Sequence, residues 1–166
     1  MIPIVNIAAV IDHTTCATAC VPHHVLVYSH NRETREKITR GLGRVPDTEI
    51  APVDFVDTAT PAALLEHMAS GRIDVAILDG EAIPAGGIGA AKQLKDELLQ
   101  CPPIAVLIAR PADVWLARWS GADAVLTHPV EPIVLNRAVV SLLRTGPFDL
   151  TVVDNATESG MEKRAD

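Results

Sequence analysis

The chain of 166 residues has the size of one domain that can bury its own core. Apolar residues make up 48% of it and charged residues 21%, as in an ordinary globular protein. The formal net charge is −7 and the basic residues are scattered, whereas binding to phosphates requires clustered lysine and arginine, so we expect no nucleic-acid partner.

The first 22 residues predict an N-terminal extension. They lack the basic leader of a signal peptide, and Asp12 interrupts them before any apolar run could span a membrane, so we expect no membrane partner. The cysteines, Cys16, Cys20 and Cys101, are odd in number, which excludes a complete disulfide framework. A reducing compartment fits this count, and we expect a cytoplasmic protein.

The same extension carries side chains that could ligate a metal. They follow one another with loosely metal-like spacing: His13, Cys16, Cys20, His23 and His24. Zinc motifs usually combine a tighter cysteine pair with a second, distant ligand pair. A partly ordered leader is therefore the favoured interpretation, and a metal site is the alternative.

Strands and helices are predicted to alternate through the middle of the chain. Apolar runs predict strands at 24–29, 50–56, 73–78, 104–108 and 124–127. Periodic segments with proline starts or glycine stops predict helices at 31–42, 60–71, 88–98, 112–120 and 132–145. Because each right-handed crossover between parallel strands needs a helix, this order predicts an α/β fold with a doubly wound, five-stranded parallel sheet.

Smaller features refine this prediction. Pro52 suits an edge strand, and Ala62, Leu65 and Ala69 are expected to share one face of the second helix. Residues 146–166 drift into charge without periodicity, which predicts a flexible C-terminal tail. The domain is therefore expected to span residues 23–145.

Asp79 is the first candidate for a functional residue. The run Val75–Leu78 has no polar alternation, as in a strand covered on both faces, and it ends at this carboxylate and a glycine-rich turn. In open parallel sheets, ligands and chemistry collect at the carboxyl ends of the strands. We therefore expect the site to surround Asp79.

Three segments together resemble the receiver domain of two-component response regulators, across roughly residues 23–144. IDVAILDGEAIPAGG resembles the family's phosphoacceptor strand, GADAVLTHPVEP its fifth strand and Lys-Pro element, and VLVYSHN its first strand with an acidic pair. The resemblance implies a flavodoxin-like sheet with the strand order 2-1-3-4-5. It also implies that Asp79 occupies the phosphoacceptor position.

The resemblance further implies where the other site residues lie, and most of them depart from the family. The acidic pair that holds a divalent cation is replaced by Ser29 and His30. The family's lysine, which contacts the phosphoryl oxygen, corresponds to His128, although Pro129 behind it is kept. Of the charged groups that assist phosphoryl transfer in the family, none is present at its own position.

The fourth strand and the loop after Asp79 depart as well. The family's serine or threonine at the end of the fourth strand is replaced by Ile108 or Ala109, and the proline comes one residue late, at Pro84. Glu81 is expected near this loop. Since Mg²⁺ prefers several oxygen ligands, we expect little or no phosphorylation and no bound cofactor.

The predicted function follows from this comparison: an atypical single-domain response regulator, or pseudo-receiver, in phosphorelay-type signalling that is not an enzyme. It would meet a protein partner or a second copy of itself through the fourth helix, fifth strand and fifth helix. Trp115 and Trp119 lie one helical turn apart on that fourth helix, and Val125 lies on the fifth strand. Tryptophan is common in interface hot spots, and we expect at least one of the two rings to be exposed.

Four alternatives remain open. The chain could accept phosphate on Asp79, with Glu81 assisting a Mg²⁺ ion. His30, His128 and Asp79 could form a facial metal triad, or protonated His128 alone could pair with Asp79 in a pH-responsive pocket. A flavodoxin-like small-ligand domain is the fourth, although the glycine-rich 85–89 segment matches no nucleotide-binding fingerprint.

Overall fold

The computed structural model describes residues 21–145 and 151–152. In this part of the chain, the strands form one parallel sheet in the order β2-β1-β3-β4-β5-β6. The strands are β1 (His23–Tyr28), β2 (Val53–Thr58), β3 (Val75–Asp79), β4 (Ile104–Ile108), β5 (Ala124–Thr127) and β6 (Thr151–Val152). The predicted order 2-1-3-4-5 is confirmed.

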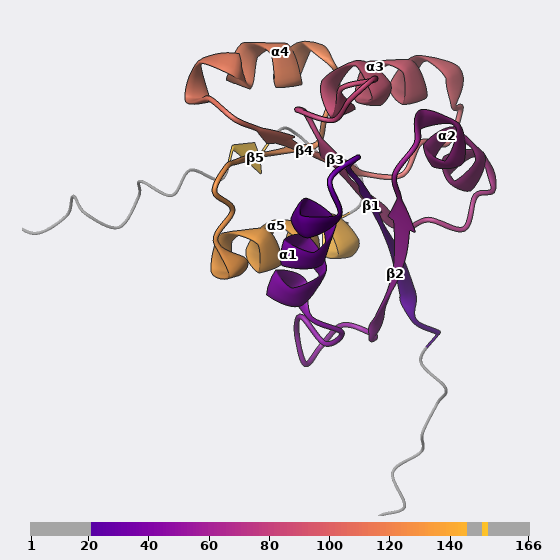
Figure 1. Cartoon of the computed structure of the whole chain (residues 1–166). Helices are drawn as coiled ribbons and strands as arrows, with labels where there is room; N and C mark the ends of the chain where they lie inside the picture. The colour runs from indigo at the N-terminus through magenta and orange to yellow at the C-terminus, as the bar shows by residue number, and fades with distance from the viewer. Residues whose placement is uncertain (1–20, 146–150, 153–166) are drawn as a thin grey trace, which may run out of the picture.

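Helices cover the sheet on both faces (Figure 1). Two of them, α1 (Arg32–Leu42) and α5 (Pro132–Thr145), pack on one face. The other face is covered by α2 (Pro61–Ala69), α3 (Gly87–Glu97) and α4 (Val114–Trp119), the last entered through a 3₁₀ turn, Pro111–Asp113. The doubly wound α/β fold is therefore confirmed.

The central strands are buried on both faces, as their unbroken apolar runs predict. On β1, Val25 and Val27 join the core under α1 and α5, whereas Leu26 and Tyr28 join the core under α2, α3 and α4. All four side chains are fully buried. Because neighbouring strand residues point to opposite faces, each strand contributes to two separate cores.

Side-chain caps begin the first two helices, and a glycine ends the first of them. Asn31 Oδ1 accepts the N–H of Glu33 at the start of α1, and Thr60 Oγ1 accepts the N–H of Ala63 at the start of α2. Gly43 ends α1 with a φ of 66°, a left-handed value that glycine adopts without a steric penalty.

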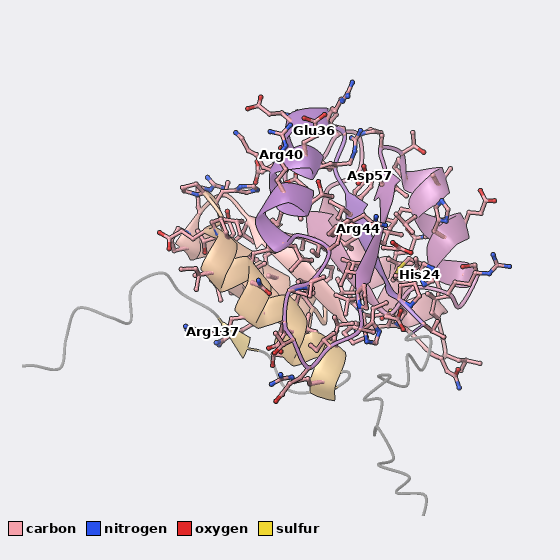
Figure 2. The ribbon with its side chains drawn as sticks, turned by 90° about the horizontal axis from the view of Figure 1, so that it is seen from below. His24, Glu36, Arg40, Arg44, Asp57 and Arg137 are labelled. Atoms are coloured by element: carbon pink, nitrogen blue, oxygen red, sulfur yellow. The ribbon has the colours of Figure 1, made fainter. Side chains whose placement is uncertain are left out.

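Seen from below, α1 and α5 lie side by side (Figure 2). The outer surface of α1 carries exposed ion pairs one turn apart, including that of Arg40 with Glu36 at 3.0 Å. Such exposed pairs contribute little to stability because solvent screens them. The packing of α1 therefore depends on Ile38 and Leu42, its buried residues.

The face of α2 that packs on the sheet is not the one that Ala62, Leu65 and Ala69 share. Ala62 and Ala69 are exposed and Leu65 is half-buried, whereas Leu64 and Met68 reach the core. Both stripes have helical spacing, and the larger side chains are the ones that face the sheet. The edge position predicted from Pro52 is confirmed, since β2 is the outer strand on that side and begins one residue later, at Val53.

The predicted C-terminal tail requires a correction, because two of its residues form β6. Thr151 and Val152 pair in parallel with Ala124 and Val125 of β5. A strand of two residues has no periodicity that a sequence could show. The rest of the predicted tail, like residues 1–20 of the predicted extension with His13, Cys16 and Cys20, lies outside the described residues. No helix in residues 21–145 is long and apolar enough to cross a membrane.

Candidate functional site

The register of the sheet places the candidate residues at one edge. Tyr28 of β1 pairs with Leu78 of β3, so Ser29 and Asp79 follow side by side. His128 comes directly after β5, and its N–H donates to the carbonyl of Ile108 at the end of β4. The carboxyl ends of four strands thus surround a carboxylate that is only 3% exposed.

Both carboxylate oxygens of Asp79 accept hydrogen bonds. The Ser29 hydroxyl donates to Oδ2 at 2.7 Å, and the backbone N–H of Glu81 donates to Oδ1 at 3.0 Å. Ser29 Oγ in turn accepts the N–H of Asn31 at 3.1 Å, which fixes the direction in which its proton points. Ser29, which replaces the first acidic residue of the family, therefore binds the aspartate as a neutral donor.

His128 approaches the same carboxylate without forming a hydrogen bond. Its Nε2 lies 3.8 Å from Asp79 Oδ1, which permits charge attraction when the imidazole is protonated but exceeds hydrogen-bond length. The predicted pH-responsive pair between His128 and Asp79 is thus present only as a long electrostatic contact. A third of the His128 side chain is exposed, so solvent weakens this attraction further.

The environment of Asp79 favours its charged form. Burial raises the pKa of this carboxyl, but the interaction with His128 and the hydrogen bonds from Ser29 and the Glu81 N–H outweigh burial and hold the pKa below its ordinary value. Asp79 is therefore a carboxylate throughout the physiological range. Its stabilising contribution is present at neutral pH and is lost as the pH falls through the lowered pKa.

His30 contacts the loop after β3 instead of the carboxylate. Its Nδ1 accepts the backbone N–H of Ile83 at 3.1 Å, and its side chain is exposed. Within residues 21–145, no three histidine, cysteine, aspartate or glutamate side chains come together in a group that could hold a metal ion. The facial triad of His30, His128 and Asp79 is therefore wrong as a hypothesis.

Tyr28 is a site residue that the sequence did not reveal. Its hydroxyl donates to the carbonyl of Ala85 at 2.7 Å, which ties the loop after β3 to the end of β1. Burial raises the pKa of Tyr28, and the nearby charge of Asp79 raises it further, so the phenol stays protonated as a donor. In the sequence Tyr28 is one more apolar residue of a buried strand, and no signal marks its second role.

The remaining predicted positions add no charge to the site. Ile108 is 1% exposed and contributes its backbone carbonyl, and the neighbouring Ala109 is exposed. Glu81 is exposed, and its backbone N–H provides its contact with Asp79. Pro129 follows His128 through a cis peptide bond.

The predicted exposure of the tryptophans on α4 is confirmed, whereas their role as an interaction surface stays a prediction. Trp115 is 67% and Trp119 58% exposed, and Lys92 of α3 places its ammonium 5.8 Å from the Trp119 ring. Val125 is wrong as a surface residue, because it is 1% exposed and packs in the core under α2, α3 and α4. On a strand covered from both sides, no residue of the middle is available to a partner.

The fold and the buried aspartate at the sheet edge define a receiver domain of the response-regulator type, and comparison with known proteins supports this class. No protein-family model matches the sequence. The chain is 55% identical over 120 residues to an uncharacterized response regulatory protein of Mycobacterium tuberculosis, present in strains CDC 1551 and H37Rv. The match covers 72% of this chain and 90% of the relative, so the chain belongs to the response regulatory proteins.

Solved structures share the fold at lower sequence identity. The receiver domain of the putative response regulator NarL from Mycobacterium tuberculosis is 23% identical, with a TM-score of 0.61, and the match covers 75% of this chain and 98% of that domain. A putative response regulator from Chloroflexus aurantiacus is 22% identical, with a TM-score of 0.62 and coverage of 75% and 99%. The receiver fold predicted from the sequence is therefore confirmed.

Proposed function

We propose that this protein is a single-domain response regulator that transmits a signal by protein contact, with little or no phosphorylation of Asp79. The observation that carries the proposal is the hydrogen bonding of Asp79, whose two oxygens accept the Ser29 hydroxyl and the Glu81 N–H. In the receiver family this carboxylate attacks phosphorus while a divalent cation neutralises the charge that develops. Here a neutral donor, the Ser29 hydroxyl, binds the nucleophile at the place where the family has its first acidic residue.

The charges around Asp79 support the same proposal. Mg²⁺ requires several oxygen ligands, commonly one or two carboxylates, and the nearest acidic side chain in the sequence, Glu81, is exposed. The family's lysine is replaced by His128, whose Nε2 is 3.8 Å from Asp79 and which is charged only when protonated. A phosphoryl group on Asp79 would therefore lack both the cation and the ammonium that stabilise it in the family.

The experiment is incubation with a small phosphodonor and Mg²⁺, followed by intact-mass measurement. We expect no phosphoryl adduct on the wild-type protein under conditions in which an ordinary receiver is phosphorylated. Asp79→Asn is the matched control, because it keeps the size of the side chain and removes the nucleophile. An adduct on the wild type that Asp79→Asn abolishes would overturn the proposal in favour of a phosphorylation-competent receiver.

The outer face of α4 is the part of the proposal that concerns the partner. We place protein contact, with a partner or a second copy, on Trp115 and Trp119, since exposed tryptophan provides large contact area at low entropic cost. We also propose a cytoplasmic location, which rests on the cysteine count and the reducing compartment it favours.

The double substitution Trp115→Ser/Trp119→Ser tests this surface. Because both rings are mostly exposed, we expect the free energy of unfolding, measured by urea denaturation, to stay within about 1 kcal/mol of the wild type. Any self-association measured by sedimentation should be lost. A decrease of about 3–5 kcal/mol per tryptophan would instead show that the rings pack in a core, which contradicts the interface.

A further inference from the structure

Among the hydrogen bonds that hold the loop after β3, three involve side chains and differ in chemistry. The Tyr28 hydroxyl donates to the Ala85 carbonyl, and Asp79 Oδ1 accepts the N–H of Glu81. The third bond joins His30 Nδ1, as acceptor, to the N–H of Ile83 at 3.1 Å. An imidazole nitrogen accepts a hydrogen bond only while it carries no proton. The His30 bond therefore exists only in the neutral form of that side chain.

We propose that His30 is a proton-sensitive latch on the segment Gly80–Pro84, so that protonation controls the loop beside the phosphoacceptor position. The inference rests on the proposed function, because it names the protonation of His30, in place of phosphorylation of Asp79, as the event that regulates the same site. Neutral His30 holds the Ile83 N–H. Protonated His30 carries a proton on Nδ1, so two N–H donors, one of His30 and one of Ile83, face each other and the contact becomes repulsive.

The other two side-chain bonds of the loop do not depend on the protonation of a histidine. The pKa of Tyr28 is raised by burial and by the charge of Asp79, so its hydroxyl keeps the proton that it donates. The pKa of Asp79 is lowered, so its carboxylate remains an acceptor. Of the three side-chain bonds, the His30 bond is therefore the one that requires an unprotonated imidazole and that protonation switches.

The ionisable groups whose contacts place them beside the loop, Ser29 or Asp79 come from several elements. They are Tyr28 of β1, Arg35 of α1, Asp79 at the end of β3, Glu81 of the loop itself and His128 after β5. Arg35 Nη1 donates to the Ser29 carbonyl at 2.6 Å. Protonation of His128 has the opposite effect, since it strengthens the attraction to Asp79 across 3.8 Å.

The two histidines would therefore change the site together as the pH falls. Protonated His128 is drawn toward Asp79 Oδ1, while protonated His30 releases Ile83, whose side chain is 67% exposed on the loop. Acidification thus stabilises the carboxylate end and frees the neighbouring backbone. The addition of one proton to each imidazole therefore changes the contacts of the loop and of Asp79 without any covalent modification.

The test compares two substitutions of His30 by nuclear magnetic resonance. His30→Asn keeps an acceptor oxygen close to the position of Nδ1 and cannot be protonated, whereas His30→Ala removes the acceptor at every pH. In the wild type, we expect exchange of the Ile83 amide proton, corrected for its intrinsic pH dependence, to become roughly five- to tenfold faster between about pH 8 and about pH 5. His30→Asn should stay slow at both pH values, and His30→Ala should be fast at both.

Two outcomes would overturn the latch. One is an Ile83 amide whose exchange changes with pH equally in the wild type and in His30→Asn, which would assign the effect to His128. The other is an amide that exchanges at one rate in the wild type and in His30→Ala. Phosphorylation is measured separately by intact mass, so an adduct on Asp79 would refute the proposed function while the exchange data still decide the latch.

Discussion

Replacing Gly87 by alanine is expected to lower the free energy of unfolding by about 3 kcal/mol, the upper part of the range for overpacked sites. A Cβ atom on Gly87 would lie 2.6 Å from the carbonyl oxygen of Asp79, 2.7 Å from its carbonyl carbon and 2.9 Å from that of Leu78. All three are backbone atoms of β3, which cannot move aside as a flexible side chain would. The first turn of α3 and the end of β3 would have to separate. Urea denaturation followed by circular dichroism measures the loss.

Gly89 provides the matched control, because it lies two residues further along the same helix. A Cβ atom there meets nothing within 4 Å. Alanine has the higher helix propensity, so Gly89→Ala should stabilise the protein by about 0.5–1 kcal/mol. If both substitutions changed stability by the same amount and sign, the close approach of α3 to Asp79 would not be what requires glycine at Gly87.

The position of Asp79 could be predicted because several local signals agree. An uninterrupted apolar run, a carboxylate at its end and glycines after it predicted a buried strand that ends at the ligand edge. Parallel pairing, which the structure shows with Tyr28 opposite Leu78, agrees with burial on both faces. The same argument explains the error at Val125. A strand buried on both faces has no alternation, so its sequence cannot tell which residues a partner could reach.

The contacts of the loop after β3 could not be predicted in this way. His30 and Ile83 are 53 residues apart, and Tyr28 and Ala85 are 57 apart. Each bond depends on the path of a glycine-rich loop that has no periodicity. The resemblance to the family suggested a pocket role for His30 and a metal hypothesis with it. The structure assigns the imidazole a backbone partner, which only three-dimensional geometry could show.

Restoring the family's charges should convert the protein into a receiver that binds Mg²⁺ and accepts phosphate. In the variant Ser29→Asp/His30→Asp/His128→Lys, a new carboxylate at position 29 replaces a hydroxyl that lies 2.7 Å from Asp79 Oδ2. Two carboxylates this close repel each other, so we expect the variant to lose stability when divalent cations are removed. Mg²⁺ neutralises the repulsion, and at about one hundred times its dissociation constant it should return about 2.7 kcal/mol.

Thermal unfolding with and without Mg²⁺, followed by intact-mass measurement after phosphodonor treatment, checks both parts. The midpoint should rise with Mg²⁺ in the variant and stay constant in the wild type, and the variant should gain a phosphoryl adduct that Asp79→Asn in the same background removes. Because a neutral hydroxyl, that of Ser29, lies beside Asp79 where the family has a carboxylate, the wild-type protein should show no response to Mg²⁺. A wild-type protein that Mg²⁺ stabilises as much as the variant would show that the missing acidic pair is not what prevents phosphorylation.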